Sequence, residues 1–356
     1  MIKQHLCNSV AVLTLDHPPV NATSQAVRQG LLDAVRAALA DARVTGIVII
    51  GARDAFSAGG DVRELGDASR NAPSLRDVIE RIESSEKPVV AALAGYALGG
   101  GLELALGCHA RIGIAPLRVG LPEVTLGVIP GAGGTQRLPR IIGAEAALDV
   151  MTSGRHLPAD EALRLGILDA LVDAPLEDAA VQFVRSGAAT GPATRRLAPP
   201  PPAFFAQFRA AHRAAWHGLL APWKIVDAVE SLYRLPRAQA AAVEREAYLQ
   251  CQASPQRAAL GHLFTVRRAL RAQRDEDREA VIAARLRAAV SLSGEWTQAE
   301  VDALAAAGRV LLTDGSARSA DEIDLVAVDR LNFPAFLGGP MFGAAHRLCV
   351  SPVPMP

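Results

Sequence analysis

The sequence predicts an α/β domain followed by a largely helical C-terminal region. As far as about residue 172, short apolar segments bounded by glycine or proline alternate with segments whose apolar residues recur at helical spacing. Four consecutive prolines at 199–202 then predict a stiff linker or surface loop. From 203 to 270 the pattern is mostly helical. The length of 356 residues favours about two domains.

The expected strands are short, apolar and rich in β-branched residues. They are 10–16, 46–51, 89–94 and 111–115. The fully apolar ones are typical of a sheet that is covered on both faces. In addition, residues 127–130 are expected to form the end of a strand that precedes a glycine turn. Residues 323–328 are expected to form a short strand near the C-terminus.

The expected helices show apolar residues every third or fourth position, or follow glycine-rich turns. They begin at about Ser24 and after residue 133, and span 74–84, 102–108, 144–151 and 159–165. Glycine follows each of the last two, which is typical of a helix C-terminus. The charged run 271–280 is predicted to be a solvated helix face or a hinge.

Composition indicates which kinds of partner and which cellular compartment to expect. Lysine plus arginine equals aspartate plus glutamate at 37 each, which favours neither a nucleic-acid nor an anionic-membrane partner. Cys7, Cys108, Cys251 and Cys349 lie far apart, as suits a reducing compartment. The N-terminus lacks the pattern of a signal peptide, and the apolar run 89–102 is shorter than the ~20 residues that span a bilayer. We therefore expect a cytoplasmic protein with no membrane partner.

Two glutamates lie in apolar surroundings. Glu103 is part of GLELALGC, and Glu123 is part of GLPEVTLGVIPG. Burial of an unpaired carboxylate is costly and tends to raise its pKa, so such groups are usually either paired or used in proton transfer. A surface position, or an ion pair of Glu103 with Arg111, is the structural alternative.

Two glycine turns offer backbone N–H groups as ligands. The turn in GYALGGG places a candidate donor at Gly100, at the start of an expected helix, and AFSAGGDV places a second near Gly60. Two converging N–H groups would form an oxyanion hole, which stabilises negative charge on a carbonyl oxygen. An ordinary tight turn has the same composition.

Taken together and in this order, three motifs resemble the crotonase family, the enoyl-CoA hydratases and isomerases. The motifs are AFSAGGDVREL, AGYALGGGLELALGC and GLPEVTLGVIPGAGGTQRLPRIIG. The separation of the glutamates, 123 − 103 = 20 residues, matches the hydratase pattern. The resemblance covers about residues 1–270 and implies a crotonase-like spiral of ββα units with helices packed below it.

The resemblance also implies roles for individual residues. The catalytic groups would be the amides of Gly60 and Gly100 and the carboxylates of Glu103 and Glu123. The family often has alanine at the position of Gly60, and the backbone donor survives that change. The substrate-binding residues would be Gly131, near the attacking water, and Ala58, Asp61 and Val62, along the CoA chain. The resemblance implies no metal and no separate cofactor, since CoA is part of the thioester substrate.

The implied activity is hydration of a 2-enoyl-CoA to a 3-hydroxyacyl-CoA in fatty-acid metabolism. Glu103 would activate the water and Glu123 would deliver a proton to C2. An enoyl-CoA isomerase or another crotonase-type acyl-CoA lyase is one alternative, and an inactive acyl-CoA-binding scaffold is another. Simple members of the family are trimers or paired trimers, so we expect a trimer-based homo-oligomer or a monomer.

The C-terminal part resembles pieces of multifunctional fatty-acid oxidation enzymes. Segment 222–264 is similar to their linker helices, and 319–342 to the end of their 3-hydroxyacyl-CoA dehydrogenase part. The dinucleotide fingerprint G-x-G-x-x-G/A does not occur, so no NAD chemistry is expected. The predicted regions are therefore a crotonase-like core at 1–195, a helical linker at 196–274 and a small dehydrogenase remnant at 275–356.

Overall fold

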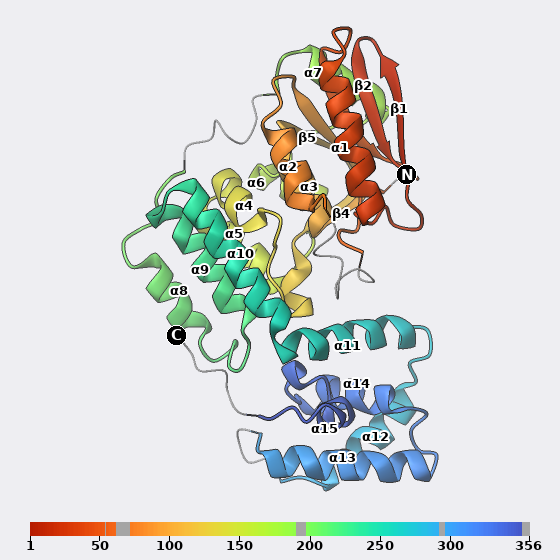
Figure 1. The fold of residues 1–356 in the computed structure, drawn as a ribbon. Coiled ribbons are helices and arrows are strands. Elements are labelled where there is room, and N and C mark those ends of the chain that lie inside the picture. The colour runs from red at the N-terminus through yellow and green to blue at the C-terminus, as the bar shows by residue number, and fades with distance from the viewer. Residues whose placement is uncertain (54, 62–71, 190–196, 292–295, 351–356) are drawn as a thin grey trace. The chain divides into compact units, whose positions relative to one another are not determined.

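The computed structural model describes residues 1–53, 55–61, 72–189, 197–291 and 296–350 (Figure 1). The chain divides into two compact units. Unit 1 consists of 1–124, 129–208 and 224–248, and unit 2 of 125–128, 209–223 and 249–356. The three predicted regions were drawn from sequence resemblance, which this division does not test, and their bounds stay a prediction.

Unit 1 is built around one sheet. Its strands are β1 (Ile2–Cys7), β2 (Val10–Leu15), β3 (Gly46–Gly51), β4 (Val89–Leu98), β5 (Ala110–Gly120), β6 (Leu157–Pro158) and β7 (Ala170–Leu171). Among the described residues they follow the order β1-β2-β3-β4-β5-β6, with β7 beside β5. The central strands β2 to β5 are parallel, whereas β1 and β6 are antiparallel to their neighbours.

The central strands are apolar on both faces because both faces are covered. Val12, Val48 and Val90 lie in register across β2, β3 and β4 and pack against helix α7 (Leu176–Arg185). The residues that follow two of them, Leu13 and Ile49, point to the opposite face and are also fully buried. This explains why β3 carries no polar side chain.

Some of the other helices of unit 1 begin or end at recognisable capping residues. These other helices are α1 (Gln25–Ala40), α2 (Leu75–Glu83), α3 (Gly100–Gly107), α4 (Gly134–Ile142), α5 (Ala144–Ser153) and α6 (Ala159–Leu165), with a 3₁₀ helix η3 (Pro122–Leu126). Ser74 and Asp77 form a capping box at the start of α2. Left-handed Gly154 and Gly166 end α5 and α6, as the sequence predicts.

The predicted strands and helices of unit 1 are largely confirmed, but one predicted strand is wrong, and β1, β6, β7 and α7 were not predicted. The predicted strand at 127–130 is wrong, because the chain there leaves η3 and continues without strand pairing to any described residue. The prediction also began the sheet at residue 10 and overlooked β1. Most side chains of β1 are exposed, so its residues carry little of the apolar signal on which strand prediction depends.

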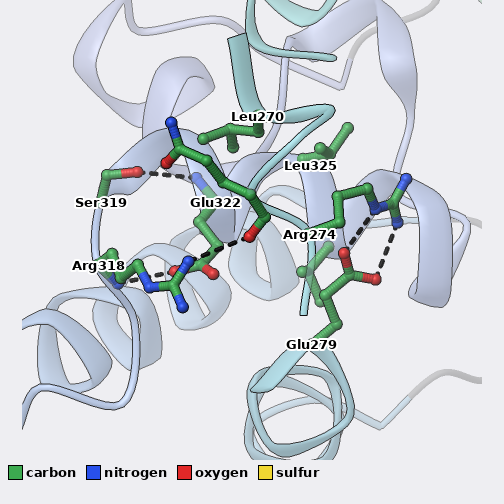
Figure 2. Close-up of a pocket in the computed structure, with 9 residues that line it drawn as sticks. Leu270, Arg274, Glu279, Arg318, Ser319, Glu322 and Leu325 are labelled. Carbon is green, nitrogen blue, oxygen red and sulfur yellow. Dashed lines mark hydrogen bonds and ion pairs between the residues drawn. The ribbon is translucent and has the colours of Figure 1, made fainter. Parts of the chain in front are cut away.

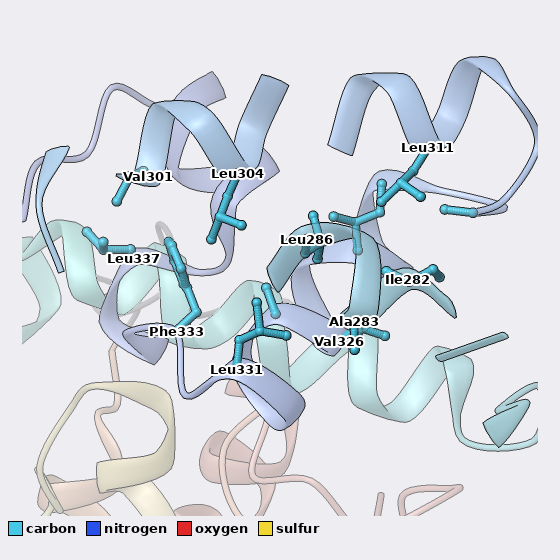
Figure 3. Close-up of a cluster of buried hydrophobic side chains, with 13 residues drawn as sticks. Ile282, Ala283, Leu286, Val301, Leu304, Leu311, Val326, Leu331, Phe333 and Leu337 are labelled. Carbon is cyan, nitrogen blue, oxygen red and sulfur yellow. The ribbon is translucent and has the colours of Figure 1, made fainter. Parts of the chain in front are cut away.

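Unit 2 contains five helices in its described C-terminal part. They are α11 (Pro255–Leu270), α12 (Glu276–Ala288), α13 (Gln298–Thr313), α14 (Ala320–Leu331) and α15 (Pro340–Ala345), with a 3₁₀ helix η5 (Ala335–Leu337). Three earlier helices contribute to both units: α8 (Phe204–His212), α9 (Ala221–Arg234) and α10 (Arg237–Ala253). The apolar core of unit 2 draws on α12, α13 and α14, and Leu286, Leu304 and Phe333 are among its buried members (Figure 3).

The predicted strand at 323–328 is wrong, because the segment lies inside α14. Ser319 caps this helix by accepting a hydrogen bond from the Glu322 amide. Ile323, Val326 and Ala327 then recur at helical spacing and are buried in the core cluster. The short apolar run is therefore one face of a helix and not a strand.

The charged run 271–280 is not simply solvated. Glu279 is only 4% exposed, and its carboxylate accepts two hydrogen bonds from Arg274, at 2.6 and 2.8 Å, and one from Arg330 at 3.0 Å. Arg274 and Glu279 also line a pocket of about 330 Å³ within unit 2, together with Arg318 and Glu322 (Figure 2). Part of this run therefore belongs to an ionic network around the buried Glu279 carboxylate.

Candidate active site

The two glycine turns lie side by side in unit 1. Ser57 forms an isolated parallel bridge with Ala97. Its N–H donates to the Tyr96 carbonyl and its carbonyl accepts from the Leu98 N–H, both at 3.0 Å. These bonds hold the turn that contains Ser57 and Gly60 against the end of β4, next to the start of α3.

The two predicted N–H donors are consequently neighbours. A Cβ atom at Gly100 would lie 3.5 Å from the Gly60 nitrogen. Gly100 is the first residue of α3, where backbone N–H groups have no carbonyl partner one turn earlier and carry partial positive charge. Gly60 is exposed, and a Cβ atom there would meet nothing within 4 Å. The structure thus brings together the two amides that the sequence predicted as an oxyanion hole.

The approach of these turns depends on Gly99 and Gly101. Gly99 has φ +52°, a conformation that side chains disfavour, and it directly precedes α3. A Cβ atom at Gly101 would lie 2.5 Å from the Ser57 carbonyl oxygen. A larger residue at Gly101 would push the two turns apart, whereas one at Gly99 would meet the Glu123 carboxyl group.

Glu103 is buried in the first turn of α3, and a third glycine-rich turn, residues 131–135, binds its carboxyl group. It is 3% exposed, and its Oε1 accepts hydrogen bonds from the Ala132 and Gly134 amides, both at 2.8 Å. Burial raises the pKa of Glu103 to about 7; the charge of Glu244 adds to this increase, and the two amides oppose it. The alternative ion pair with Arg111 is wrong, because the Arg111 guanidinium pairs with Asp169 at 2.8 Å.

Glu123 lies in η3, and its carboxyl group is close to Gly99. Its Oε2 is shielded from solvent and has no hydrogen-bond partner among the described residues. Its Oε1 lies 3.0 Å from the place that a Cβ atom at Gly99 would occupy. Burial raises the pKa of Glu123 well above its ordinary value, and the charge of Glu103 raises it further. The two carboxyl groups therefore lie within electrostatic range, and their surroundings differ.

Two of the predicted substrate-binding residues, Ala58 and Asp61, lie in the turn of Gly60, and Gly131 lies in the turn that binds Glu103. Ala58 lies between Ser57 and the glycines, and its N–H donates to the Val20 carbonyl at 3.0 Å. Asp61 follows Gly60 and is 8% exposed. Gly131 immediately precedes Ala132, whose amide binds Glu103. Val62 lies outside the described residues.

Sequence reasoning missed a third buried carboxylate, Glu244 of α10. Its side chain is fully buried and accepts hydrogen bonds from Arg76 and from the Thr135 hydroxyl, both at 2.6 Å. In the sequence it stands in AAVEREAYLQ, an alternation of charged and apolar residues that is ordinary for a helix. No local signal distinguishes it from a solvated glutamate.

The described residues were also compared with the requirements of metal sites, disulfide bonds and membrane-spanning helices. They contain no group of three or more His, Cys, Asp or Glu side chains that could hold a metal ion. All four cysteines are free thiols. No helix in the described part of the chain has the length and apolar character needed to cross a membrane.

Comparison with known proteins places the chain in a family. The profile of the enoyl-CoA hydratase/isomerase family matches residues 5–213. The chain belongs to this family. The finding confirms the predicted crotonase-type membership and the α/β fold class with a helical C-terminal region.

Individual relatives agree with this assignment. The peroxisomal bifunctional enzyme of Danio rerio is 43% identical over 267 residues, which are 73% of this chain and 37% of that protein. The chain thus spans less than half the length of this relative. A probable enoyl-CoA hydratase of Bacillus subtilis (strain 168) is 46% identical over 165 residues, 45% of this chain and 64% of that protein. The structure of Pseudomonas aeruginosa DspI has a TM-score of 0.50 at 29% identity, and the match covers 60% of this chain and 90% of that one.

Proposed function

We propose that this enzyme hydrates 2-enoyl-CoA thioesters to 3-hydroxyacyl-CoA thioesters. The observation that carries the proposal is the pair of glutamates with unequal surroundings: Glu103 is buried and bound by two amides, whereas Glu123 has a shielded oxygen with no partner among the described residues. Beside them lie the two neighbouring amides of Gly60 and Gly100. The bifunctional enzyme and the probable enoyl-CoA hydratase among the relatives support the same activity.

The amides would act on the thioester carbonyl. Its oxygen would accept hydrogen bonds from the N–H groups of Gly60 and Gly100, and would gain negative charge as water adds to the double bond. The partial positive charge at the start of α3 would stabilise this enolate. The carbonyl would thus draw electrons from C3 and prepare it for attack.

The two glutamates would divide the proton transfers between them. The two amide donors favour ionised Glu103, so it would take a proton from water as the water oxygen bonds to C3. Burial and the charge of Glu103 raise the pKa of Glu123 and favour its protonated form, so Glu123 would deliver its proton to C2 as the enolate collapses. A proton returned from Glu103 to Glu123 would restore both groups for the next turnover.

The rest of the substrate would lie along the first turn. Ala58, Asp61 and Val62 would line the CoA chain, and Gly131 would face the attacking water. The proposal includes no metal and no separate cofactor, because CoA is part of the thioester and hydration involves no net oxidation. It also includes a role in fatty-acid metabolism and no NAD-dependent step.

Double-bond isomerisation is the second candidate, because the matched family includes isomerases. Isomerisation needs a single carboxyl group to carry a proton between C2 and C4, and Glu123 could do this alone. The amide-bound Glu103 adds a base for water, which favours hydration. An inactive acyl-CoA-binding scaffold would need neither carboxyl group.

Location and assembly complete the proposal. The neutral charge balance and the free cysteines support a cytoplasmic location. In contrast, the bifunctional relatives are named as peroxisomal enzymes. We propose a trimer-based homo-oligomer or a monomer. Light scattering of the purified protein distinguishes the two states by mass.

The test is the loss of crotonyl-CoA absorbance on addition of the purified protein. We expect turnover by the parent and a fall of at least ~100-fold in Glu123→Gln, which keeps the shape of the side chain but has no acidic proton to transfer. A 3-enoyl-CoA supplied in parallel identifies isomerisation. Binding of crotonyl-CoA by the parent without turnover of either substrate would contradict the proposal and favour the scaffold.

A further inference from the structure

The proposed mechanism leaves Glu244 without a task, although it is the most completely buried of the three carboxyl groups at the site. Its Oε2 accepts from the Thr135 hydroxyl at 2.6 Å and from the Thr135 N–H at 3.2 Å. Its Oε1 accepts from Arg76 at 2.6 Å. Both oxygens are therefore occupied by donors, which is how a buried carboxylate is normally stabilised.

These contacts tie down both ends of one short turn. Residues 131–135 contain the two amides, of Ala132 and Gly134, that bind Glu103. At the end of the turn, Thr135 bonds directly to Glu244. At its start, the same Arg76 Nη2 that binds Glu244 also donates to the Gly131 carbonyl at 3.0 Å. Glu244 thus fixes the turn from both sides, at one end through Arg76.

We propose that Glu244 is a positioning residue that clamps turn 131–135, so that the amides of Ala132 and Gly134 hold the Glu103 carboxylate in place to activate water. The inference rests on the proposed hydration. Glu244 itself touches neither the substrate nor the reacting atoms in this proposal. Its effect passes through Thr135 and Arg76 to the turn, and from the turn to Glu103.

The charge of Glu244 gives the clamp a second, measurable effect. It raises the pKa values of both Glu103 and Glu123, while Arg137, which donates to the Ala132 carbonyl at 3.0 Å, lowers that of Glu103. Activity needs Glu103 ionised and Glu123 protonated. Removal of the Glu244 charge would lower both pKa values, so both limbs of the pH–rate profile would move to lower pH.

Glu244→Gln is the first test. Glutamine keeps the shape but offers one acceptor oxygen and one NH₂ group, so either Arg76 or Thr135 must face a donor. We expect kcat for crotonyl-CoA to fall roughly 10–100-fold, as for a misplaced catalytic group, with KM changed by less than about threefold. We also expect both pH limbs to shift to lower pH. Asp324→Asn, which alters a buried carboxylate of unit 2, serves as the matched control and should move neither limb.

Thr135→Val is the second test and remains informative if Glu244→Gln does not fold. It removes the hydroxyl that binds Glu244 but keeps the Glu244 charge. We expect kcat to fall by a similar factor while both pH limbs stay in place. A loss of activity with unmoved limbs in both variants would assign Glu244 a merely structural role and overturn its electrostatic part. Folded variants whose kcat stays within roughly twofold of the parent would overturn the clamp itself.

A readout without substrate separates this inference from the proposed function. The carboxyl band of Glu103, assigned in infrared difference spectra by its absence in Glu103→Gln, reports the ionisation of Glu103 directly. If the parent does not hydrate crotonyl-CoA but the titration of Glu103 moves to lower pH in Glu244→Gln, the proposed function fails and the coupling stands. If the parent is active and neither kcat nor this titration changes, the coupling fails alone.

Discussion

Glu103→Gln should stabilise unit 1 at alkaline pH, although it removes a proposed catalytic group. Burial raises the pKa of Glu103 to about 7, so folding works against ionisation of this side chain. The amides of Ala132 and Gly134 both donate to the same oxygen, Oε1, so the carbonyl oxygen of a glutamine can accept both bonds. The substitution therefore removes the cost of ionisation and keeps the contacts.

The pKa values fix the sign and size of this effect. Because the folded-state pKa is raised, the stability contributed by protonated Glu103 is full below its unfolded value of 4.5 and is lost as the pH rises through about 7. The gap between about 7 and 4.5, at 1.36 kcal/mol per pH unit, amounts to about 3 kcal/mol. Glu103→Gln should thus raise the free energy of unfolding of unit 1 by up to about 3 kcal/mol at about pH 8 and by less than about 1 kcal/mol at about pH 5.

The assay must report on unit 1. The three tryptophans, Trp216, Trp223 and Trp296, all belong to unit 2, so their fluorescence follows the other part of the chain. Hydrogen exchange of peptides from β4 and α3, compared between parent and variant at the same pH, measures the free energy of opening around Glu103 itself. We expect slower exchange in Glu103→Gln at about pH 8 and nearly equal exchange at about pH 5.

Glu279→Gln provides a control of opposite sign. Hydrogen bonds from Arg274 lower the pKa of Glu279, so its stabilising contribution is present above its unfolded pKa and is lost as the pH falls. Its replacement should destabilise unit 2 at about pH 8, as seen by tryptophan fluorescence. If Glu103→Gln were no more stable than the parent at that pH, or if its advantage did not grow between about pH 5 and pH 8, burial would not be the dominant influence on Glu103.

Three further substitutions test the geometry of the site and of unit 2. Gly60→Ala should keep kcat within roughly threefold, because its new Cβ atom meets nothing within 4 Å and the backbone donor remains. Gly99→Ala should lower kcat at least ~10-fold in the same crotonyl-CoA assay, since Gly99 has φ +52° and the new Cβ atom would lie 3.0 Å from the Glu123 Oε1. Phe333→Ala should cost unit 2 about 3–5 kcal/mol, measured by urea denaturation followed through Trp296, whose ring packs edge-on against Phe333.

Much of the fold could be predicted because local pattern and tertiary burial agree. The strand 46–51 is apolar throughout because both faces of β3 are covered, and the helix at 159–165 ends at a left-handed glycine. Prediction from sequence failed where the local pattern and the burial in the fold disagree. The strand β1 lies at a sheet edge with most side chains exposed, so its pattern is weak. The apolar run at 323–328 predicts a strand, but it lies inside α14, which Ser319 caps.

The site was partly predictable for a similar reason. Glu103 and Glu123 stand out because each lies among apolar neighbours in the sequence, next to a glycine turn. Asymmetry between them could not be predicted, because it depends on which backbone amides reach each carboxyl group across the fold. Only the structure shows that two amides reach Glu103 while the Glu123 Oε2 has no described partner.

Glu244 shows how far the site extends along the chain. The family profile matches residues 5–213, yet the carboxylate that ties down turn 131–135 comes from α10, and residues 224–248 belong to the same compact unit as the sheet. Without Glu244, the Thr135 hydroxyl and Arg76 would lose their buried acceptor, and an unsatisfied buried donor is costly. The helix that carries Glu244 therefore contributes to the electrostatics of Glu103 and Glu123, because its charge raises the pKa values of both.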